Sequence, residues 1–152
     1  MKDNLEPALS DPLNEDLLEA LLRSSRTTLA GVEQVLKEYG LCPTEFGVLE
    51  AVAALGPQPI QVLAARVLVT SGSMTYTVNQ LRRKGLITRV CSREDARRWY
   101  LHLTPEGELL IRRALRAHNQ RVAHLFAPLP DRDKHELIRL LTPLFQPSEQ
   151  RV

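Results

Sequence analysis

Apolar residues recur at helical intervals through the first forty positions. Between Pro12 and Gly40, leucines and valines follow one another at spacings of three and four residues, which places them on one face of a helix. Asp11 is a suitable N-cap, Pro12 fits the first turn, and Gly40 fits the left-handed residue that often ends a helix. The pattern predicts one long helix over 12–40, about 40 Å in length. A helix of this length in a small protein often packs against a second subunit.

Three shorter helices are predicted in the next part of the chain. The apolar positions after Pro43 predict a helix to about Leu55, where a Gly-Pro-Gln-Pro run interrupts the pattern. A short third helix is predicted over 60–67. A fourth is predicted over 71–84, ended by Gly85.

The fourth predicted helix has one apolar and one polar face. Met74, Val78 and Leu81 lie at positions i, i+4 and i+7, so we expect them to face inward. The opposite arc then holds side chains that carry charge or form hydrogen bonds. They are Ser73, Tyr76, Asn79, Gln80 and Arg83.

After Gly85 the pattern changes to short segments that favour β-structure. Residues 86–90 and 98–103 are predicted strands, and residues 92–97 between them are polar. We therefore expect a β-hairpin with a basic tip.

Two helices are predicted in the C-terminal third. The first begins at Thr104 and Pro105 and extends to Pro128, and the second begins at about Asp131. The apolar residues of the last helix are crowded enough to predict burial on more than one side, and Pro143 should bend or end it. These residues are Leu137, Ile138, Leu140, Leu141, Leu144 and Phe145.

Length and composition place the chain among ordinary single domains. It has 152 residues, of which 43% are hydrophobic and 25% charged. Two cysteines are too few for a disulfide framework, and we find no leader segment and no apolar run of the roughly 20 residues that cross a bilayer. We expect a cytoplasmic protein with no membrane partner.

Charge is distributed unevenly along the chain. Residues 1–50 hold four basic and ten acidic side chains, a net charge of −6, whereas residues 71–100 hold seven basic and two acidic ones, a net charge of +5. A concentrated positive charge suits a surface that binds a polyanion, because neutralising phosphates releases counterions. A basic stretch can equally be a solvated face.

The order of the elements matches a winged helix-turn-helix. In such a unit the second helix of the pair lies in the major groove of DNA, and the basic hairpin reaches the neighbouring minor groove, where arginine is favoured. We expect a mainly α fold with a small β-hairpin wing, and double-stranded DNA as the partner. The alternative from another class is a winged-helix protein-interaction module without DNA binding.

Two segments carry a resemblance to a known family. The segment TSGSMTYTVNQLRRKGLITR at 70–89 resembles the recognition helix and first wing strand of the MarR family of bacterial transcriptional regulators. The segment EDARRWYLHLTPEG at 94–107 resembles the return of that wing, with its Asp-x-Arg and Leu-Thr-Pro-x-Gly signature. The match covers about residues 12–146.

The resemblance implies an organisation and a function. Residues 1–152 would form one domain, in which helices over 12–40 and 105–146 hold a homodimer and residues 41–104 form the DNA-binding lobe. The dimer would bind a pseudo-palindromic operator, with its two recognition helices about 34 Å apart. It would repress transcription until a small, often phenolic or aromatic, ligand or an oxidant releases it.

The resemblance also implies which residues contact DNA. Asp95 and Arg97 match the wing pair in which a carboxylate orients an arginine toward the minor groove, although a plain surface salt bridge would look the same. Ser73, Thr75 and Tyr76 fall where the family contacts bases or phosphates, and Tyr76 replaces a frequent arginine. The rest of the expected DNA-contacting set is Ser71, Asn79, Gln80, Arg83, Arg93 and Arg98.

Sensing chemistry is less clear from the sequence. Cys42 occupies the N-cap slot before Pro43, where a helix N-terminus favours the thiolate, so it is a candidate redox sensor. Against this, the peroxide-sensing branch of the resembled family carries its reactive cysteine in the first helix, and residues 1–41 contain none. Cys91 fits a small, half-buried strand residue better than a reactive one.

The sequence contains few residues that point to a ligand site and no motif typical of catalysis. Tyr39, Phe46 and Trp99 are candidates for the side chains near an effector, although aromatic residues are more often part of the core. The four histidines show no metal-ligand spacing, and there is no phosphate-binding glycine loop or nucleophile elbow. We therefore expect no metal, no cofactor and no enzyme activity, and the ligand-binding residues stay unknown.

Overall fold

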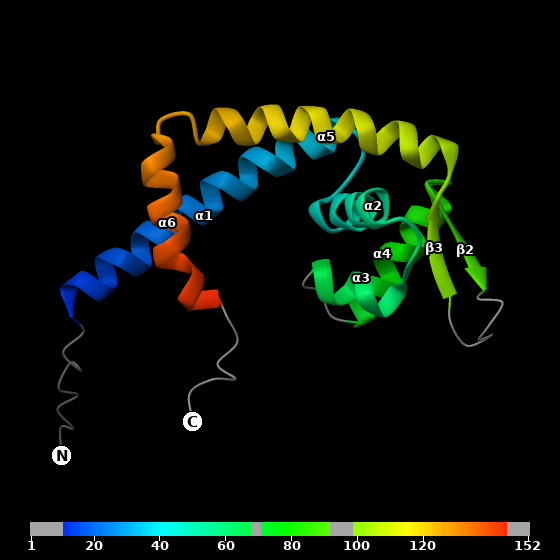
Figure 1. The fold of residues 1–152 in the computed structure, drawn as a ribbon, viewed down its shortest axis with the longest axis horizontal. Helices are drawn as coiled ribbons and strands as arrows, with labels where there is room; N and C mark the ends of the chain where they lie inside the picture. Colours follow the sequence, from blue (N-terminus) through cyan, green and yellow to red (C-terminus); the bar gives the residue numbers. More distant parts are fainter. Residues whose placement is uncertain (1–10, 68–70, 92–98, 146–152) are drawn as a thin grey trace, which may run out of the picture.

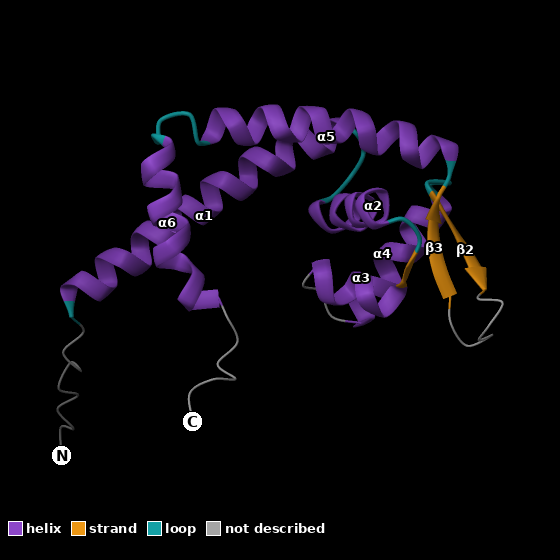
Figure 2. Ribbon diagram, viewed as in Figure 1, coloured by secondary structure: helices purple, strands orange, loops and turns teal. Residues whose placement is uncertain are grey.

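The computed structural model describes residues 11–67, 71–91 and 99–145, which form six helices and a small sheet (Figure 1). The elements in chain order are α1 Pro12–Glu38, α2 Pro43–Leu55, β1 Gln58–Pro59, α3 Ile60–Val67, α4 Ser71–Arg83, β2 Ile87–Cys91, β3 Trp99–Leu103, α5 Pro105–Leu125 and α6 Asp131–Phe145. Figure 2 shows that helices dominate and that the strands occupy one end of the molecule. The mainly α fold with a small sheet is confirmed.

The helix boundaries follow the local signals in the sequence. The Asp11 carboxylate accepts a hydrogen bond from the Leu13 N–H at 3.0 Å and caps α1. Gly40, with φ of 66°, turns the chain after this helix. The Thr104 hydroxyl caps α5 in the same way, by accepting from the Gly107 N–H at 3.0 Å. These ends were predictable because each depends on neighbouring residues only.

The sheet contains one strand that the hydrophobic pattern did not predict. The three strands are antiparallel in the order β1-β3-β2, and in the hairpin Ile87 lies opposite Leu103 and Cys91 opposite Trp99. Strand β1 has only two residues, Gln58 and Pro59, within the run that we expected merely to interrupt the helices. Two residues show no alternation, and a proline is tolerated on an edge strand, so this pairing is visible only in the fold.

The molecule has two parts joined by α5 (Figure 1). Helices α2, α3 and α4 and the sheet gather below one end of α5 and form a compact lobe. The C-terminal half of α1 runs beside α5, and these two helices pack on each other. The first half of α1 and the whole of α6 lie at the other end, away from the lobe.

The buried core lies in the lobe. Its fully buried side chains come from α2, α3, α4 and β3 of the lobe, from the last turns of α1 and from the first turns of α5. The largest of them are Leu36, Leu49, Leu63, Met74, Leu81, Leu101 and Ile111. The predicted inward face of α4 is confirmed, because Met74, Val78 and Leu81 are completely buried.

The prediction for the last helix is wrong within a single chain. Leu137, Ile138, Leu140 and Leu144 are 43–67% exposed rather than buried on more than one side. The reason is that α6 packs extensively on no other described element. Pro143 lies inside α6, which continues two residues further and ends at Phe145.

Helix α1 shows the same imbalance. Five of its leucines are about half exposed or more, and its buried residues are Gly31 and Leu36 in the C-terminal half. The exposed ones are Leu13, Leu17, Leu18, Leu22 and Leu29. Of the helices described here, none is both long and apolar enough to span a bilayer.

Candidate nucleic-acid interface

The polar arc of α4 forms one exposed surface. The side chain of Tyr76 is 66% exposed, and Ser73, Thr75, Asn79 and Arg83 are also exposed, while Gln80 is half-buried. The structure therefore brings together the residues that the sequence predicted on this helix. Ser71 is the first residue of α4. Of the remaining predicted residues, Arg93, Asp95, Arg97 and Arg98 lie outside the described part of the chain.

The inner side of α4 holds this arc toward solvent. Its apolar face is buried in the lobe core, and the neighbouring Thr77 is buried with its hydroxyl donating to the Ser73 carbonyl at 2.9 Å. The hydroxyl is satisfied within the helix, so its burial leaves no unpaired polar atom. Rotating α4 would expose the core, which fixes the direction of the polar arc.

A lysine anchors the C-terminal end of α4 to the start of the lobe. Lys84 Nζ donates to the Glu45 carboxylate and to the Gly40 carbonyl, both at 2.7 Å. The same Glu45 oxygen accepts from the Cys42 N–H at 3.0 Å. The Glu45 side chain is only 7% exposed, and that of Lys84 is 36% exposed. The α1–α2 junction and the end of α4 are thus joined by one buried carboxylate, a contact that sequence reasoning missed.

Replacing Lys84 by methionine is expected to lower the free energy of unfolding by about 1–2 kcal/mol, because a buried carboxylate loses its counterion. Urea unfolding followed by circular dichroism measures this. Lys134→Met is the matched control, since Lys134 is equally exposed but its partner Asp131 is 89% exposed. The control should change stability by less than about 0.5 kcal/mol. Equal effects of the two substitutions would contradict an anchoring role for Lys84.

The Leu-Thr-Pro-x-Gly signature has a structural role. The Thr104 hydroxyl donates to the Gly85 carbonyl at 2.7 Å, and the Thr104 N–H donates to the Leu86 carbonyl at 3.1 Å. Gly107 lies directly against the same carbonyl, because a Cβ built on it would stand 2.0 Å from the Leu86 oxygen. The signature therefore fastens α5 to the turn between α4 and β2.

Positive charge gathers beside the end of α4. Arg82 and Arg83 on α4 and Arg89 on β2 line a cleft of about 660 Å³, together with Asn79, Thr88 and Thr104. Burial lowers the pKa of Arg89, and the positive charge of Arg82 lowers it further. The sequence predicted Arg83 as a DNA contact, whereas Arg82 and Arg89 were not in the predicted set.

The two cysteines differ in exposure. Cys42 is exposed at the N-cap of α2, and Cys91 is half-buried at the end of β2. The exposure of Cys42 is compatible with a sensor, and its reactivity stays a prediction.

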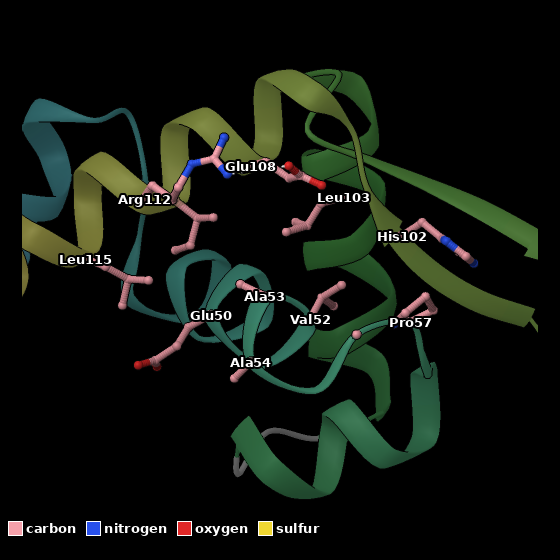
Figure 3. A pocket seen from close by; sticks show the side chains of 12 residues that line it. Glu50, Val52, Ala53, Ala54, Pro57, His102, Leu103, Glu108, Arg112 and Leu115 are labelled. Atoms are coloured by element: carbon pink, nitrogen blue, oxygen red, sulfur yellow. Dashed lines mark ion pairs between the residues drawn. The ribbon is translucent and has the colours of Figure 1, made fainter.

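A second cavity lies between the lobe and α5 (Figure 3). It measures about 750 Å³, and α2, β3 and α5 surround it. Val52, Leu103 and Leu115 supply apolar walls, and Glu108 and Arg112 form an ion pair of 3.6 Å on α5.

None of the three predicted aromatic residues lines this second cavity. Phe46 is buried in the core, with its ring centroid 4.8 Å from that of His118. Trp99 is 47% exposed on β3, and Tyr39 is the C-cap of α1. The cavity is instead lined by residues that the sequence did not single out.

The helix pair α3 and α4, the outward polar arc of α4 and the hairpin that follows define a winged helix-turn-helix protein. Residues 39–98 match the MarR family model. The chain is 38% identical over 105 residues to an uncharacterized HTH-type transcriptional regulator, YkoM of Bacillus subtilis, covering 69% of this chain and 68% of the relative. It is 31% identical over 117 residues to the HTH-type transcriptional regulator MhqR of Bacillus subtilis, covering 77% and 81%.

A solved structure supports the same fold. Sco3205, a MarR family transcriptional regulator from Streptomyces coelicolor that was crystallised in complex with DNA, superposes with a TM-score of 0.83 at 20% identity, covering 93% of this chain and 96% of that one. The chain belongs to the MarR family of transcriptional regulators. The family resemblance and the winged-helix fold expected from the sequence are confirmed.

Proposed function

We propose that this regulator acts as a homodimeric repressor that binds a pseudo-palindromic operator and releases it when a small molecule binds. The observation that carries the proposal is the polar arc of α4, which faces solvent because the opposite face of the helix is locked into the lobe core. This arrangement lets a recognition helix enter the major groove without loss of core packing.

The DNA contacts are divided between the recognition helix and the wing. Ser73, Thr75 and Tyr76 lie toward the N-terminal half of α4, the part of a recognition helix that meets base edges, whereas Asn79, Gln80 and Arg83 are better placed for phosphates. Ser71 belongs to the first group. Arg93, Asp95, Arg97 and Arg98 would act from the wing.

The dimer interface is formed by α1, α5 and α6. Exposed leucines on α1 and α6 are too many for a monomer in water, and covering the exposed half of each one contributes about 1 kcal/mol. The placement of the exposed leucines outside the lobe supports a single domain in which residues 12–40 and 105–146 form the dimer and residues 41–104 bind DNA. The protein works in the cytoplasm, and no catalytic step is part of this function.

The effector binds in the cavity between α2, β3 and α5. Its apolar walls and charged rim suit a small molecule with an aromatic or aliphatic body and one polar end. Because the cavity lies where α2 and β3 of the lobe meet α5, a bound molecule would change the position of α4 relative to the dimer helices. The affinity for DNA would then fall, and the largest possible factor is the ratio of the effector's affinities for the two positions of α4.

The test is a titration of the purified protein against genomic fragments, including the DNA that flanks its own gene, at several salt concentrations. We expect tight, salt-sensitive binding at a palindrome, and its loss on adding one member of a panel of phenolic compounds. A parallel titration with a thiol oxidant, using wild type and Cys42→Ser, tests the sensor. The absence of any selective site at low salt would overturn the proposal in favour of a protein-interaction module.

A further inference from the structure

The cleft between α4 and β2 has an excess of positive charge that the lobe does not balance. Arg82 and Arg83 project from the last turn of α4, and Arg89 lies on the neighbouring strand. Among the described residues, no carboxylate forms an ion pair with any of these three. Three guanidinium groups around one cleft repel one another, so an anion in the cleft would be stabilised.

Arg89 is held in this cleft by the sheet. It lies opposite Leu101 in the hairpin, on the same side as Ile87, and both of these neighbours are buried in the core. Its Nε atom is buried and has no hydrogen-bond partner. A buried N–H donor without a partner is costly in a folded protein, and a ligand oxygen would remove that cost.

The position of the cleft indicates which anion it accepts. One wall is the C-terminal turn of the recognition helix, and the other is the first wing strand. A DNA strand that passes from the major groove under α4 to the minor groove under the wing runs between these two elements. Guanidinium groups also match phosphate oxygens in geometry as well as in charge.

We propose that this cleft binds a phosphodiester of the DNA backbone, with Arg82 and Arg89 as its principal ligands and Asn79 and Thr88 as additional donors. The inference rests on the proposed function and deepens it. Bases are read near the start of α4, and the backbone is held where the helix meets the wing. Arg82 and Arg89 are therefore positioning residues for the complex and carry no sequence information.

The test compares Arg82→Gln and Arg89→Gln with wild type in titrations of an operator duplex and a scrambled duplex across a range of salt concentrations. Each substitution should weaken binding at least about tenfold on both duplexes and should lower the slope of log K against log salt by about 2, because it removes one phosphate contact from each protomer of the dimer. Arg113→Gln removes the same charge from an exposed position outside the cleft, in the part of α5 that packs on the lobe. Once ultracentrifugation shows that this variant keeps the oligomeric state of wild type, it should leave affinity and slope unchanged.

Replacing single phosphates by uncharged methylphosphonates identifies which phosphate the cleft contacts. In a series of operator duplexes, each with one methylphosphonate, one position in each half-site should weaken binding of wild type but should not weaken binding of Arg89→Gln any further. Arg89→Lys keeps the charge and should restore most of the salt slope. Arg82 is exposed, so Arg82→Gln gives the answer if the inward-facing Arg89→Gln fails to fold.

Some outcomes would overturn the assignment. If both glutamine variants match Arg113→Gln while wild type binds its operator, the cleft holds no phosphate and the proposed function still stands. A loss on the operator alone, with the scrambled duplex unaffected, would mean base reading instead. If wild type binds no duplex, the proposed function and this assignment fail together.

Discussion

Alanine at position 107 is expected to lower the free energy of unfolding by about 3 kcal/mol or more. The new Cβ would lie 2.0 Å from the Leu86 carbonyl oxygen and 3.0 Å from its carbon, both of which are backbone atoms. Overpacking usually costs about 1–3 kcal/mol, and it costs more when the neighbour cannot move. The Leu86 carbonyl is also held by the Thr104 N–H at 3.1 Å. Relief of the clash would therefore break the junction between the wing and α5.

Urea unfolding of Gly107→Ala, followed by circular dichroism, measures this cost. Gly72→Ala is the control, because Gly72 is also helical and its Cβ would have no atom within 4 Å. Alanine favours a helix over glycine, so the control should be more stable by about 0.5–1 kcal/mol. Similar unfolding midpoints for the two variants would contradict the close packing of α5 on the turn after α4.

Replacing Ile138 by glutamate is expected to convert the dimer into monomers and to weaken operator binding by about a hundredfold or more. Ile138 is 63% exposed on the apolar face of α6, on which none of the other helices and strands in the described ranges packs extensively. In a dimer interface, the carboxylate would be buried without a partner, which costs several kcal/mol. A monomer also loses the advantage of a dimer, in which binding of one protomer raises the effective concentration of the other at its half-site.

Analytical ultracentrifugation and an operator titration measure the two effects of Ile138→Glu. Leu55→Glu introduces the same charge at a residue that is 45% exposed in the lobe, and it should leave the protein dimeric. Because α6 lies apart from the lobe core, the variant should keep its helical circular dichroism spectrum. A dimeric Ile138→Glu variant with full affinity would show that α6 is not part of the interface.

The elements with local signals were predictable from the sequence. The limits of α1, α2 and α4 agree with the prediction within about two residues, because capping residues and prolines act on the turn beside them. The polar arc of α4 was predictable for a similar reason, since helical periodicity places residues on opposite faces whatever the rest of the fold does. Strand β1 was not, since its pairing with β3 joins segments about forty residues apart.

Helix α6 shows a second limit of prediction from the sequence. Its apolar pattern predicts that the helix is covered, but a pattern does not state whether the cover comes from the same chain. No described element of this chain covers the apolar face of α6, and the same residues become evidence for a second subunit.

The sequence by itself determined the fold class, the family and the residues on the exposed polar arc of α4, because these depend on periodicity and on contiguous motifs. Only the tertiary structure decided which contacts hold α4 in the lobe and where the arginines beside it lie without an acidic partner among the described residues. The Lys84–Glu45 pair, the contact of Gly107 with Leu86 and the cleft of Arg82 and Arg89 each join separate elements. Such contacts depend on how elements pack in space, and neither periodicity nor local spacing encodes that packing.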